Sequence, residues 1–298
     1  MPYTREIELC EGKDLQIEQY TEGEEGCVVW DAALVLTSYL QKKRDATAPT
    51  PIYNHALDIG SGTGVVGLAL LKMCIAQNVT LTDRASQIPL IRRNADLNCT
   101  AEQLANNLRV ETLTWDCEEE VSRIESSHHT FDLITASDCV YGDKSSACLA
   151  VLLSRLITAN PEVTILISFE ARGRHGVEVA SGADYSSEFF LLLARDFGCT
   201  VTEVSEREHG AYHAPEISIY IVSKADLEET RVQEAAVAEA SPLSADAKHL
   251  QAQRDGSRCS CGCVPNVSSL FEMAQKRAAH RAKQKMDADA AEKAATSA

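Results

Sequence analysis

This sequence has few basic residues and lacks a long apolar run. Its 28 Lys and Arg are outnumbered by 44 Asp and Glu, which gives a formal net charge of -16. Because phosphate binding needs a basic face, this balance argues against a nucleic-acid partner. The opening segment Met1–Glu8 is polar and charged, and no stretch approaches the length of a membrane span. We therefore expect a cytoplasmic or nuclear protein that binds neither membranes nor nucleic acids.

The chain does have enough apolar residues for a core, and its acid is unevenly distributed. Hydrophobic residues make up 45% of the 298 residues. Residues 225–298 hold 11 acidic and 10 basic residues, which leaves 33 acidic and 18 basic for residues 1–224. An acidic surface favours a partner that is basic at the point of contact. Solubility alone is the alternative explanation of the acidity.

The 11 cysteines do not indicate a disulfide framework. In a chain without an export signal they are expected to be reduced thiols, packed as small hydrophobic side chains. Cys74, Cys139 and Cys199 fall in segments with a core-like pattern and are examples.

Residues 225–298 differ in texture from the rest of the chain. They are rich in Ala, Glu, Lys and Gln and contain few large apolar residues, so we expect a largely disordered tail. A basic helix is expected within it, over Leu270–Met286. The single-residue spacing in Cys259-x-Cys261-x-Cys263 and the lack of a nearby fourth ligand make zinc binding a weak interpretation, and no metal site is predicted.

Strand-like and helix-like patterns alternate from Ala56 onward, which indicates a mostly parallel α/β sheet with helices on both faces. The last two strands have a short polar connection and should form an antiparallel hairpin at the sheet edge. Earlier in the chain, the patterns predict a β-hairpin of Ile7–Cys10 with Leu15–Gln19, and a helix over Trp30–Lys43. The expected strands are Ala56–Ile59, Val79–Thr82, Leu108–Leu113, Phe131–Thr135, Val163–Phe169, Thr200–Ser205 and Glu216–Ser223, and the expected helices are Val65–Cys74, Gln87–Asn98, Lys144–Thr158 and Tyr185–Phe197.

A glycine-rich segment, Leu57–Gly64, follows the first of these strands and precedes a helix. Glycines let the backbone turn tightly and approach a ligand with no Cβ in the way. Alone, this spacing occurs in nucleotide-binding folds of several chemistries. Asp58 in the strand end and Asp83 at the end of the next strand make it more specific, because the Asp83 carboxylate can accept both hydroxyls of a ribose. A structural turn with a helix-capping Asp is the alternative.

Two further segments end strands at the same edge. Trp115-Asp116 follows the third strand, where the indole is expected beside an adenine ring and Asp116 near its amino group. A half-buried aromatic side chain at a sheet edge explains Trp115 equally well. Asp138 and Tyr141 follow the fourth strand, at the carboxyl edge where open α/β sheets bind ligands. Together they can hold an ammonium group by charge and by cation–π contact, whereas in a generic protein they would be a helix cap and a core ring.

These segments together resemble a known family, the seven-strand protein-lysine methyltransferases with an acid-x-x-Tyr motif. The likeness covers about Glu6 to Lys224, and the tail has no counterpart in it. It rests on Gly26–Ala33, Asp58–Gly64, Thr82-Asp83, Asn94…Asn98, Trp115 and Asp138–Tyr141. A narrower likeness, to the branch that methylates valosin-containing protein, an AAA ATPase, rests on Gln19-Tyr20 and His209…Tyr212…Glu216-Ile217.

The resemblance implies a Rossmann-like seven-strand sheet in a domain of residues 1–224, with S-adenosylmethionine as the cofactor. It implies Asp138 and Tyr141 as catalytic residues. The cofactor residues that it implies are Trp30, Asp58, Gly60, Ser61, Gly62, Asp83, Trp115 and Ser137. Ser137 and Asp116 depart from the family, which has Ala and Gly at these positions.

On this resemblance the chain is a monomer that transfers methyl groups to the ε-amine of a lysine on a protein, namely valosin-containing protein. An Hsp70-type chaperone is the alternative protein substrate, and small-molecule methylation is a further alternative. Outside the enzyme class, the chain could be a cofactor-binding interaction module without catalysis. An intact pair of Asp138 and Tyr141 favours catalysis, because a degenerate module has no reason to keep substrate-side residues.

Overall fold

The computed structural model places most of the first 225 residues. They belong to a compact unit, Met1–Lys224. None of the described helices is both long and apolar enough to cross a membrane. The predicted tail helix and Cys259-x-Cys261-x-Cys263 lie outside the described residues. The residues that the structure describes are 1–9, 13–46, 51–127, 130–170 and 185–225.

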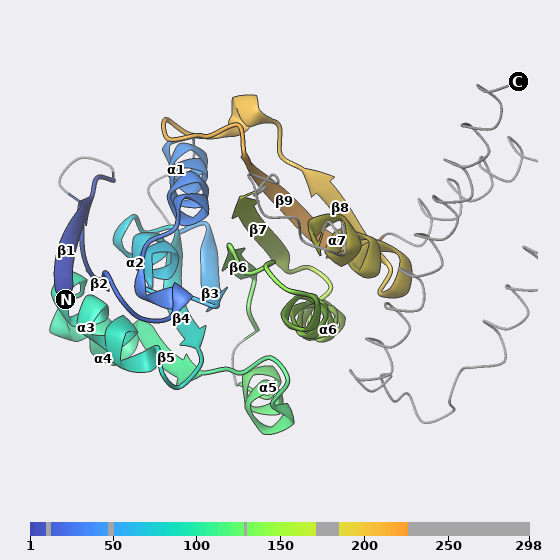
Figure 1. Ribbon diagram of the computed structural model, residues 1–298, viewed down its shortest axis with the longest axis horizontal. Helices are drawn as coiled ribbons and strands as arrows, with labels where there is room; N and C mark the ends of the chain where they lie inside the picture. The colour runs from blue at the N-terminus through green and yellow to red at the C-terminus, as the bar shows by residue number, and fades with distance from the viewer. Residues whose placement is uncertain (10–12, 47–50, 128–129, 171–184, 226–298) are drawn as a thin grey trace, which may run out of the picture. The chain divides into compact units, whose positions relative to one another are not determined.

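A seven-stranded sheet with the order β5-β4-β3-β6-β7-β9-β8 forms the centre of this unit (Figure 1). Strands β3 to β7 run parallel, and β9 lies antiparallel between β7 and β8. The predicted Rossmann-like sheet with an antiparallel C-terminal hairpin is therefore confirmed. The strands are β3 (Tyr53–Ile59), β4 (Ala76–Asp83), β5 (Leu108–Thr112), β6 (Leu133–Ser137), β7 (Thr164–Glu170), β8 (Cys199–Glu203) and β9 (Ile217–Lys224).

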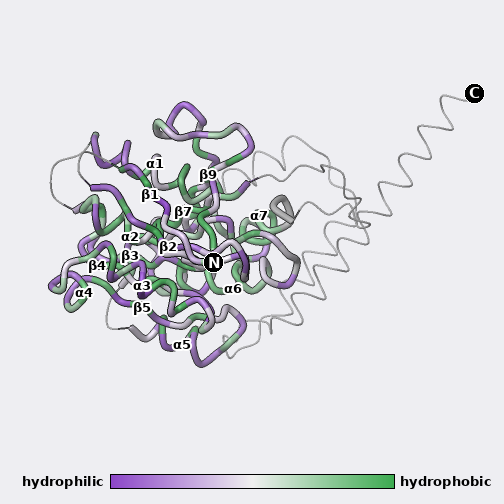
Figure 2. Tube along the Cα trace, turned by 60° about the vertical axis from the view of Figure 1, so that its left-hand side comes forward, coloured by the Kyte–Doolittle hydropathy of each residue, from purple (hydrophilic) through white to green (hydrophobic). Residues whose placement is uncertain are grey.

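Helices cover both faces of the sheet, as Figure 1 shows. Neighbouring residues of a strand point to opposite faces, so Leu166 of β7 packs with one apolar cluster and Ile165 and Ile167 with the other. Apolar stretches accordingly follow the central strands, and polar ones the outer loops (Figure 2). One face carries α1 (Asp31–Asp45), α2 (Val65–Lys72) and α3 (Ile88–Asn98), and the other α5 (Glu118–Glu125), α6 (Asp143–Ala159) and α7 (Tyr185–Asp196).

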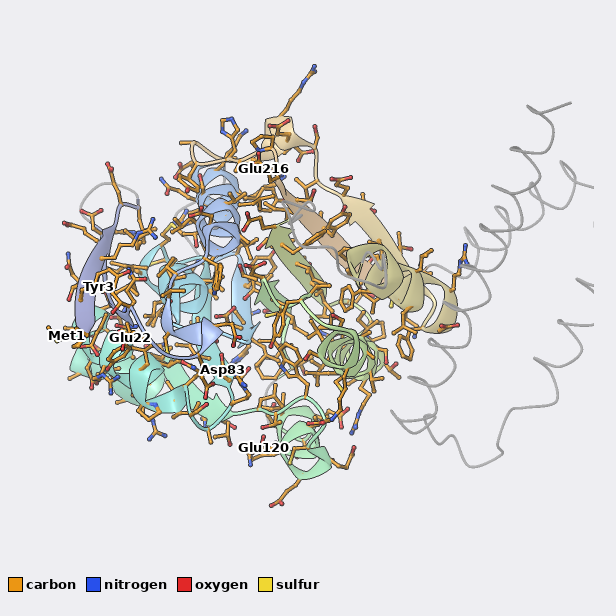
Figure 3. The ribbon with its side chains drawn as sticks, viewed as in Figure 1. Met1, Tyr3, Glu22, Asp83, Glu120 and Glu216 are labelled. Atoms are coloured by element: carbon orange, nitrogen blue, oxygen red, sulfur yellow. The ribbon has the colours of Figure 1, made fainter. Side chains whose placement is uncertain are left out.

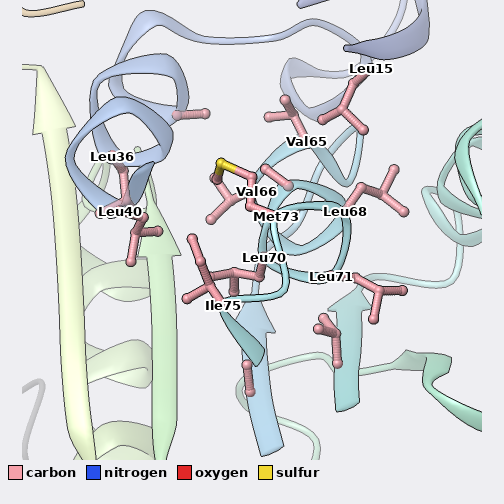
Figure 4. Packing of buried hydrophobic residues seen from close by; sticks show 14 of the residues in the cluster. Leu15, Leu36, Leu40, Val65, Val66, Leu68, Leu70, Leu71, Met73 and Ile75 are labelled. Carbon is pink, nitrogen blue, oxygen red and sulfur yellow. The ribbon is translucent and has the colours of Figure 1, made fainter. Parts of the chain in front are cut away.

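Close packing around α2 fixes the loop that precedes it. Leu36 and Leu40 of α1 are buried and point toward α2 (Figure 4). On the sheet side, a Cβ added at Gly67 would lie 2.0 Å from Leu81 Cδ2, so α2 lies directly on β4. The helix cannot shift without opening one of these contacts, because interiors are packed densely. The start of α2 at Val65 is therefore held in place relative to the strand ends.

The N-terminal hairpin is confirmed, but its first strand was placed wrongly. Strand β1 (Pro2–Ile7) pairs with β2 (Leu15–Tyr20), with Ile7 opposite Leu15, and does not continue into residues 8–9; Cys10 lies outside the described residues. Most residues of β1 are exposed, so the strand lacks the alternation by which it could be recognised. Likewise β6 covers Leu133–Ser137 and not Phe131–Thr135, since its buried stretch continues to Ala136.

Three other expectations were also wrong. The helices α4 (Ala101–Asn106) and α5 were not predicted, because each is short and buries few residues. The connection from β8 to β9 is neither short nor loose: it contains a 3-10 turn over Glu206–Glu208, and Gly210 in it packs on α1. Cys74 is exposed, with φ 56°, since it lies in the turn after α2, whereas Cys139 and Cys199 are buried.

Candidate functional site

The ten residues predicted for the site line a single cavity of about 490 Å³. The cavity lies where β3, β4, β5 and β6 end, at the carboxyl edge of the sheet where open α/β folds bind ligands. Its volume is in the range of small-molecule and cofactor sites. The structure brings the ten predicted residues together, but the role of each one stays a prediction. The ten residues are Trp30, Asp58, Gly60, Ser61, Gly62, Asp83, Trp115, Ser137, Asp138 and Tyr141.

The glycine loop between β3 and α2 is shaped by a close approach at Gly62. This residue has φ +54°, a conformation that glycine adopts at little cost. A Cβ here would lie 3.1 Å from the carbonyl oxygen of Gly26, so the loop runs directly against the segment before α1. Ser61 N donates to Thr82 O at 2.9 Å and ties the loop to β4. A side chain at Gly62 would push the glycine loop away from Gly26 and so change the shape of the cavity.

Asp83 ends β4 beside this loop, and Figure 3 labels it there. Its Oδ2 accepts a hydrogen bond from Gly62 N at 2.8 Å, and its Oδ1 accepts one from Arg84 N at 2.7 Å. Burial raises the pKa of this carboxyl, and the two N–H donors oppose that rise. A carboxylate has about four acceptor sites, so both oxygens can still accept ribose hydroxyls.

Asp58 lies deeper, with a relative exposure of 1%. Thr135 Oγ1 donates to its Oδ1 at 2.6 Å, whereas Oδ2 is buried and has no hydrogen-bond partner among the described residues. Burial raises the pKa of this carboxyl to about 6, against the opposing effect of the Thr135 hydroxyl. A buried polar atom without a partner is costly. An ammonium group in the cavity would remove that cost.

A second part of the cavity wall is formed by residues 24–30, which run beside the glycine loop and which we call the wall segment. Four of its residues besides Trp30 line the cavity. Trp30 Nε1 donates to Glu25 O at 2.8 Å, which fixes the indole against its own segment. Glu24 Oε2 lies 2.9 Å from Arg84 Nη2, in an ion pair that joins the wall segment to the residue after Asp83. The wall segment is thus tied to the end of β4.

Trp115 lies in the loop after β5, and its ring is near Gly60: a Cβ added there would be 3.2 Å from Cζ2. The position of Asp116 near an adenine amino group stays a prediction. Its carboxylate forms an ion pair with Lys144 Nζ at 3.0 Å, and both residues line the cavity. Both are substantially exposed, so the pair adds little stability. An adenine amino group would have to share Asp116 with Lys144.

Asp138 and Tyr141 lie after β6, between the cavity and solvent. Asp138 has φ 54°, a left-handed conformation that costs energy in a residue with a side chain. Its N donates to Ser168 O at 2.7 Å, and its Oδ1 accepts from Glu170 N at 3.4 Å. Tyr141 is 50% exposed, and partial burial raises the pKa of its phenol. Strain of this kind persists where the surroundings enforce it, often at functional sites.

Sequence reasoning missed several residues of the cavity. Arg84 and Cys139 directly follow predicted residues, so the neighbourhood itself was a signal. Thr135 supports Asp58 from the neighbouring strand β6, in the register that pairs the two residues. Lys144 and Cys148 come from α6, and only the packing of that helix brings them to the cavity.

The residues present fit S-adenosylmethionine. The unpaired Oδ2 of Asp58 suits the ammonium of the methionine part, the Asp83 carboxylate suits the ribose, and the glycine loop leaves room for a ligand against its backbone. Two buried carboxylates in one cavity favour a cationic ligand. These are the residues that would hold the cofactor.

Replacement of Asp83 should weaken cofactor binding more than it weakens the fold. Asp83→Ala removes one or two charge-assisted hydrogen bonds, worth roughly 1.5–3 kcal/mol each. Trp30 and Trp115 are the only 2 tryptophans of the chain and both line the cavity, so quenching of their fluorescence measures the affinity. Asp132→Ala is the matched control, because Asp132 accepts from Asn54 N and His55 N outside the cavity. Equal losses of affinity in both variants would contradict the assignment.

The affinity for S-adenosylmethionine should rise with pH through about 6, the pKa of Asp58. Only the ionised carboxylate receives the ammonium, so binding below this pKa must displace a proton, and the affinity falls by up to about tenfold per pH unit. Asp58→Asn should bind weakly but with a flatter profile between pH 5 and about 7.5. An equally steep profile in Asp58→Asn would assign the pH dependence to another group, such as Asp83.

Comparisons with known proteins agree with this site. Residues 9–196 match the family described as lysine methyltransferase. EEF1A lysine methyltransferase 3 of Xenopus tropicalis is 28% identical over 167 residues, which cover 55% of this chain and 67% of that protein. METTL21A of Mus musculus, a protein N-lysine methyltransferase, is 28% identical over 195 residues, 65% of this chain and 74% of that protein. The protein-lysine N-methyltransferase EFM6 of Saccharomyces cerevisiae is 31% identical over 204 residues, 63% and 78% respectively.

The match to the family spans well over half of the chain and includes every predicted site residue, from Trp30 to Tyr141. The relatives share one chemistry, lysine methylation, although the narrower likeness to the branch that methylates valosin-containing protein stays a prediction. With the seven-strand sheet and its cavity, the conclusion is direct: the chain belongs to the lysine methyltransferase family and is an S-adenosylmethionine-dependent protein-lysine N-methyltransferase.

Proposed function

We propose that this chain methylates a lysine of valosin-containing protein, and that the lysine enters the cavity beside Asp138 and Tyr141. The observation that carries the choice of entrance is the pair itself. Asp138 is held in a left-handed conformation at the end of β6, and Tyr141 is half exposed at the rim of the same cavity. A carboxylate and an aromatic face are the two groups that attract an ammonium ion.

The choice of substrate is supported by the two stretches that carry the narrower resemblance, because both contact Gly26–Ala33 in the structure. Gln19 Oε1, of the first stretch, accepts from Val29 N at 3.0 Å. Tyr212 Oη, of the second stretch, donates to Asp31 Oδ1 at 3.2 Å. Tyr212 is 44% exposed, so it is a residue of these stretches that a protein partner could contact.

The residues of the chain must orient the amine, remove its water and take away its proton. S-adenosylmethionine, when bound, supplies an electrophilic methyl group with its own leaving group. A lysine near its ordinary pKa of about 10.4 is almost fully protonated at pH 7. In the proposed mechanism, partial burial between Tyr141 and the cavity wall lowers that pKa, and the proton leaves to water or to the Asp138 carboxylate. Orientation supplies the rest of the rate.

Two other substrates follow from the comparisons and from the resemblance. EEF1A is the substrate in the name of one relative, and an Hsp70-type chaperone remains the alternative that the resemblance gave. The acidic excess of residues 1–224 suits a basic segment of any of these proteins. The cytoplasmic or nuclear location and the monomeric state stay predictions.

Substitution of the rim pair should reduce methyl transfer and leave the fold intact. Asp138→Asn tolerates the left-handed conformation and removes only the charge. We expect Asp138→Asn and Tyr141→Ala each to lower transfer more than about tenfold, which is about 1.4 kcal/mol of barrier. Tyr141→Phe keeps the aromatic face and is the matched control, with a smaller loss. Measurement of melting, cofactor affinity and transfer on the same preparations separates this role from a structural one. Full activity in a folded Asp138→Asn protein would remove that carboxylate from the site.

The substrate is tested by competition. Purified valosin-containing protein, EEF1A and an Hsp70-type chaperone are mixed at equal concentration with the chain and labelled S-adenosylmethionine, and the labelled band and residue are identified by mass spectrometry. We expect the label on a lysine of valosin-containing protein. Label on either of the others would replace this substrate and keep the activity. An inactive Asp138→Asn chain controls for transfer by contaminants.

A further inference from the structure

Two asparagines of α3 hold the N-terminal hairpin by its backbone. Asn94 Oδ1 accepts from Glu18 N at 2.7 Å, and its Nδ2 donates to Glu18 O at 3.0 Å. Asn98 repeats the arrangement with Gln16, at 2.8 Å in both directions. The two asparagines are one helical turn apart and reach alternate residues of β2, as the peptide groups of a neighbouring strand would.

Asn94 differs from Asn98 in its third hydrogen bond. Its Nδ2 also donates to Thr63 O at 2.8 Å, and Thr63 lies in the glycine loop between Gly62 and Gly64. The third bond of Asn98 goes instead to the backbone oxygen of Asn94, at 2.7 Å, inside the helix. Asn94 is fully buried, so each of these bonds replaces one to water that the fold has removed. Of the two asparagines, it is therefore Asn94 that joins the hairpin to the glycine loop.

The hairpin also holds the wall segment, through Gln19. This side chain has a relative exposure of 2%, and its Oε1 accepts from Val29 N at 3.0 Å. Val29 directly precedes Trp30 in the wall segment. Neither Gln19 nor Asn94 is among the residues that line the cavity. Both act on it through the backbone of other segments.

We propose that the N-terminal hairpin positions the cofactor cavity, with Asn94 and Gln19 as positioning residues for S-adenosylmethionine binding. Asn94 fixes the position of the glycine loop through its hydrogen bond to Thr63 O. Gln19 fixes the position of the wall segment through its hydrogen bond from Val29 N, next to Trp30. Because Asn94 is bound to β2 at Glu18 and Gln19 is the next residue of β2, the hairpin fixes the glycine loop and the wall segment relative to one another. This role goes beyond the choice of protein substrate and rests only on cofactor binding in this cavity.

The matched pair Asn94→Ala and Asn98→Ala tests the proposal. Each variant loses two hydrogen bonds to β2, so both should melt at a lower temperature than the parent. Only Asn94→Ala also frees Thr63, and loss of that bond should weaken S-adenosylmethionine binding at least about fivefold. Asn98→Ala should bind within about twofold of the parent. The affinity is measured by quenching of Trp30 and Trp115, at a temperature where all proteins are folded.

A second variant covers the case in which Asn94→Ala does not fold. Gln19→Met keeps the size of the side chain and removes the acceptor for Val29 N. We expect it to weaken cofactor binding at least about threefold and to shift the tryptophan emission of the unliganded protein, because Trp30 follows the freed residue.

Parent-like cofactor affinity in folded Asn94→Ala overturns the proposal, as does an equal loss of affinity in Asn98→Ala. If Asn94→Ala does not fold, parent-like affinity in Gln19→Met overturns it. A parent chain that binds no S-adenosylmethionine would remove the cofactor site itself, and the two failures are thereby told apart.

Discussion

The hydrogen bond from Gly62 N to Asp83 Oδ2 joins the glycine loop to the end of β4, and the cavity is arranged around it. It forms only because Gly62 takes φ +54° and because β3 and β4 are adjacent and parallel. The same loop then supports the wall segment, which passes 3.1 Å from a Cβ that Gly62 lacks. Sheet order, loop composition and cavity shape therefore depend on one another.

Electrostatics explain why such a cavity selects a cation. Burial raises the pKa of both Asp58 and Asp83, and the charge of Asp83 adds to the rise at Asp58. Two carboxyls that resist ionisation are a cost to the folded protein, and a positively charged ligand offsets it. S-adenosylmethionine carries positive charge on both its ammonium and its sulfonium. The rim adds a further carboxylate, Asp138, at the side where a lysine would enter.

The sheet and most of the site were predictable because their signals are local. Alternating strand and helix patterns predicted a mostly parallel sheet, and Asp58, Asp83 and Asp138 lie at or next to the carboxyl ends of its strands. The rest depends on tertiary contacts. The ion pair of Asp116 with Lys144 joins the loop after β5 to α6, and no sequence pattern predicts that these two residues meet. The exposed strand β1 and the short helix α5 bury too little apolar surface to leave a pattern.

The central claim is that this cavity directs methyl transfer to a lysine side chain. The most direct measurement is the identity of the methylated amino acid. Protein substrates are labelled by the chain with S-adenosylmethionine carrying an isotopic methyl group, hydrolysed to free amino acids, and separated against standards. The account predicts that the label is recovered as Nε-methylated lysine. Recovery in methylarginine, in methylhistidine or in a small molecule, with none in lysine, would contradict it.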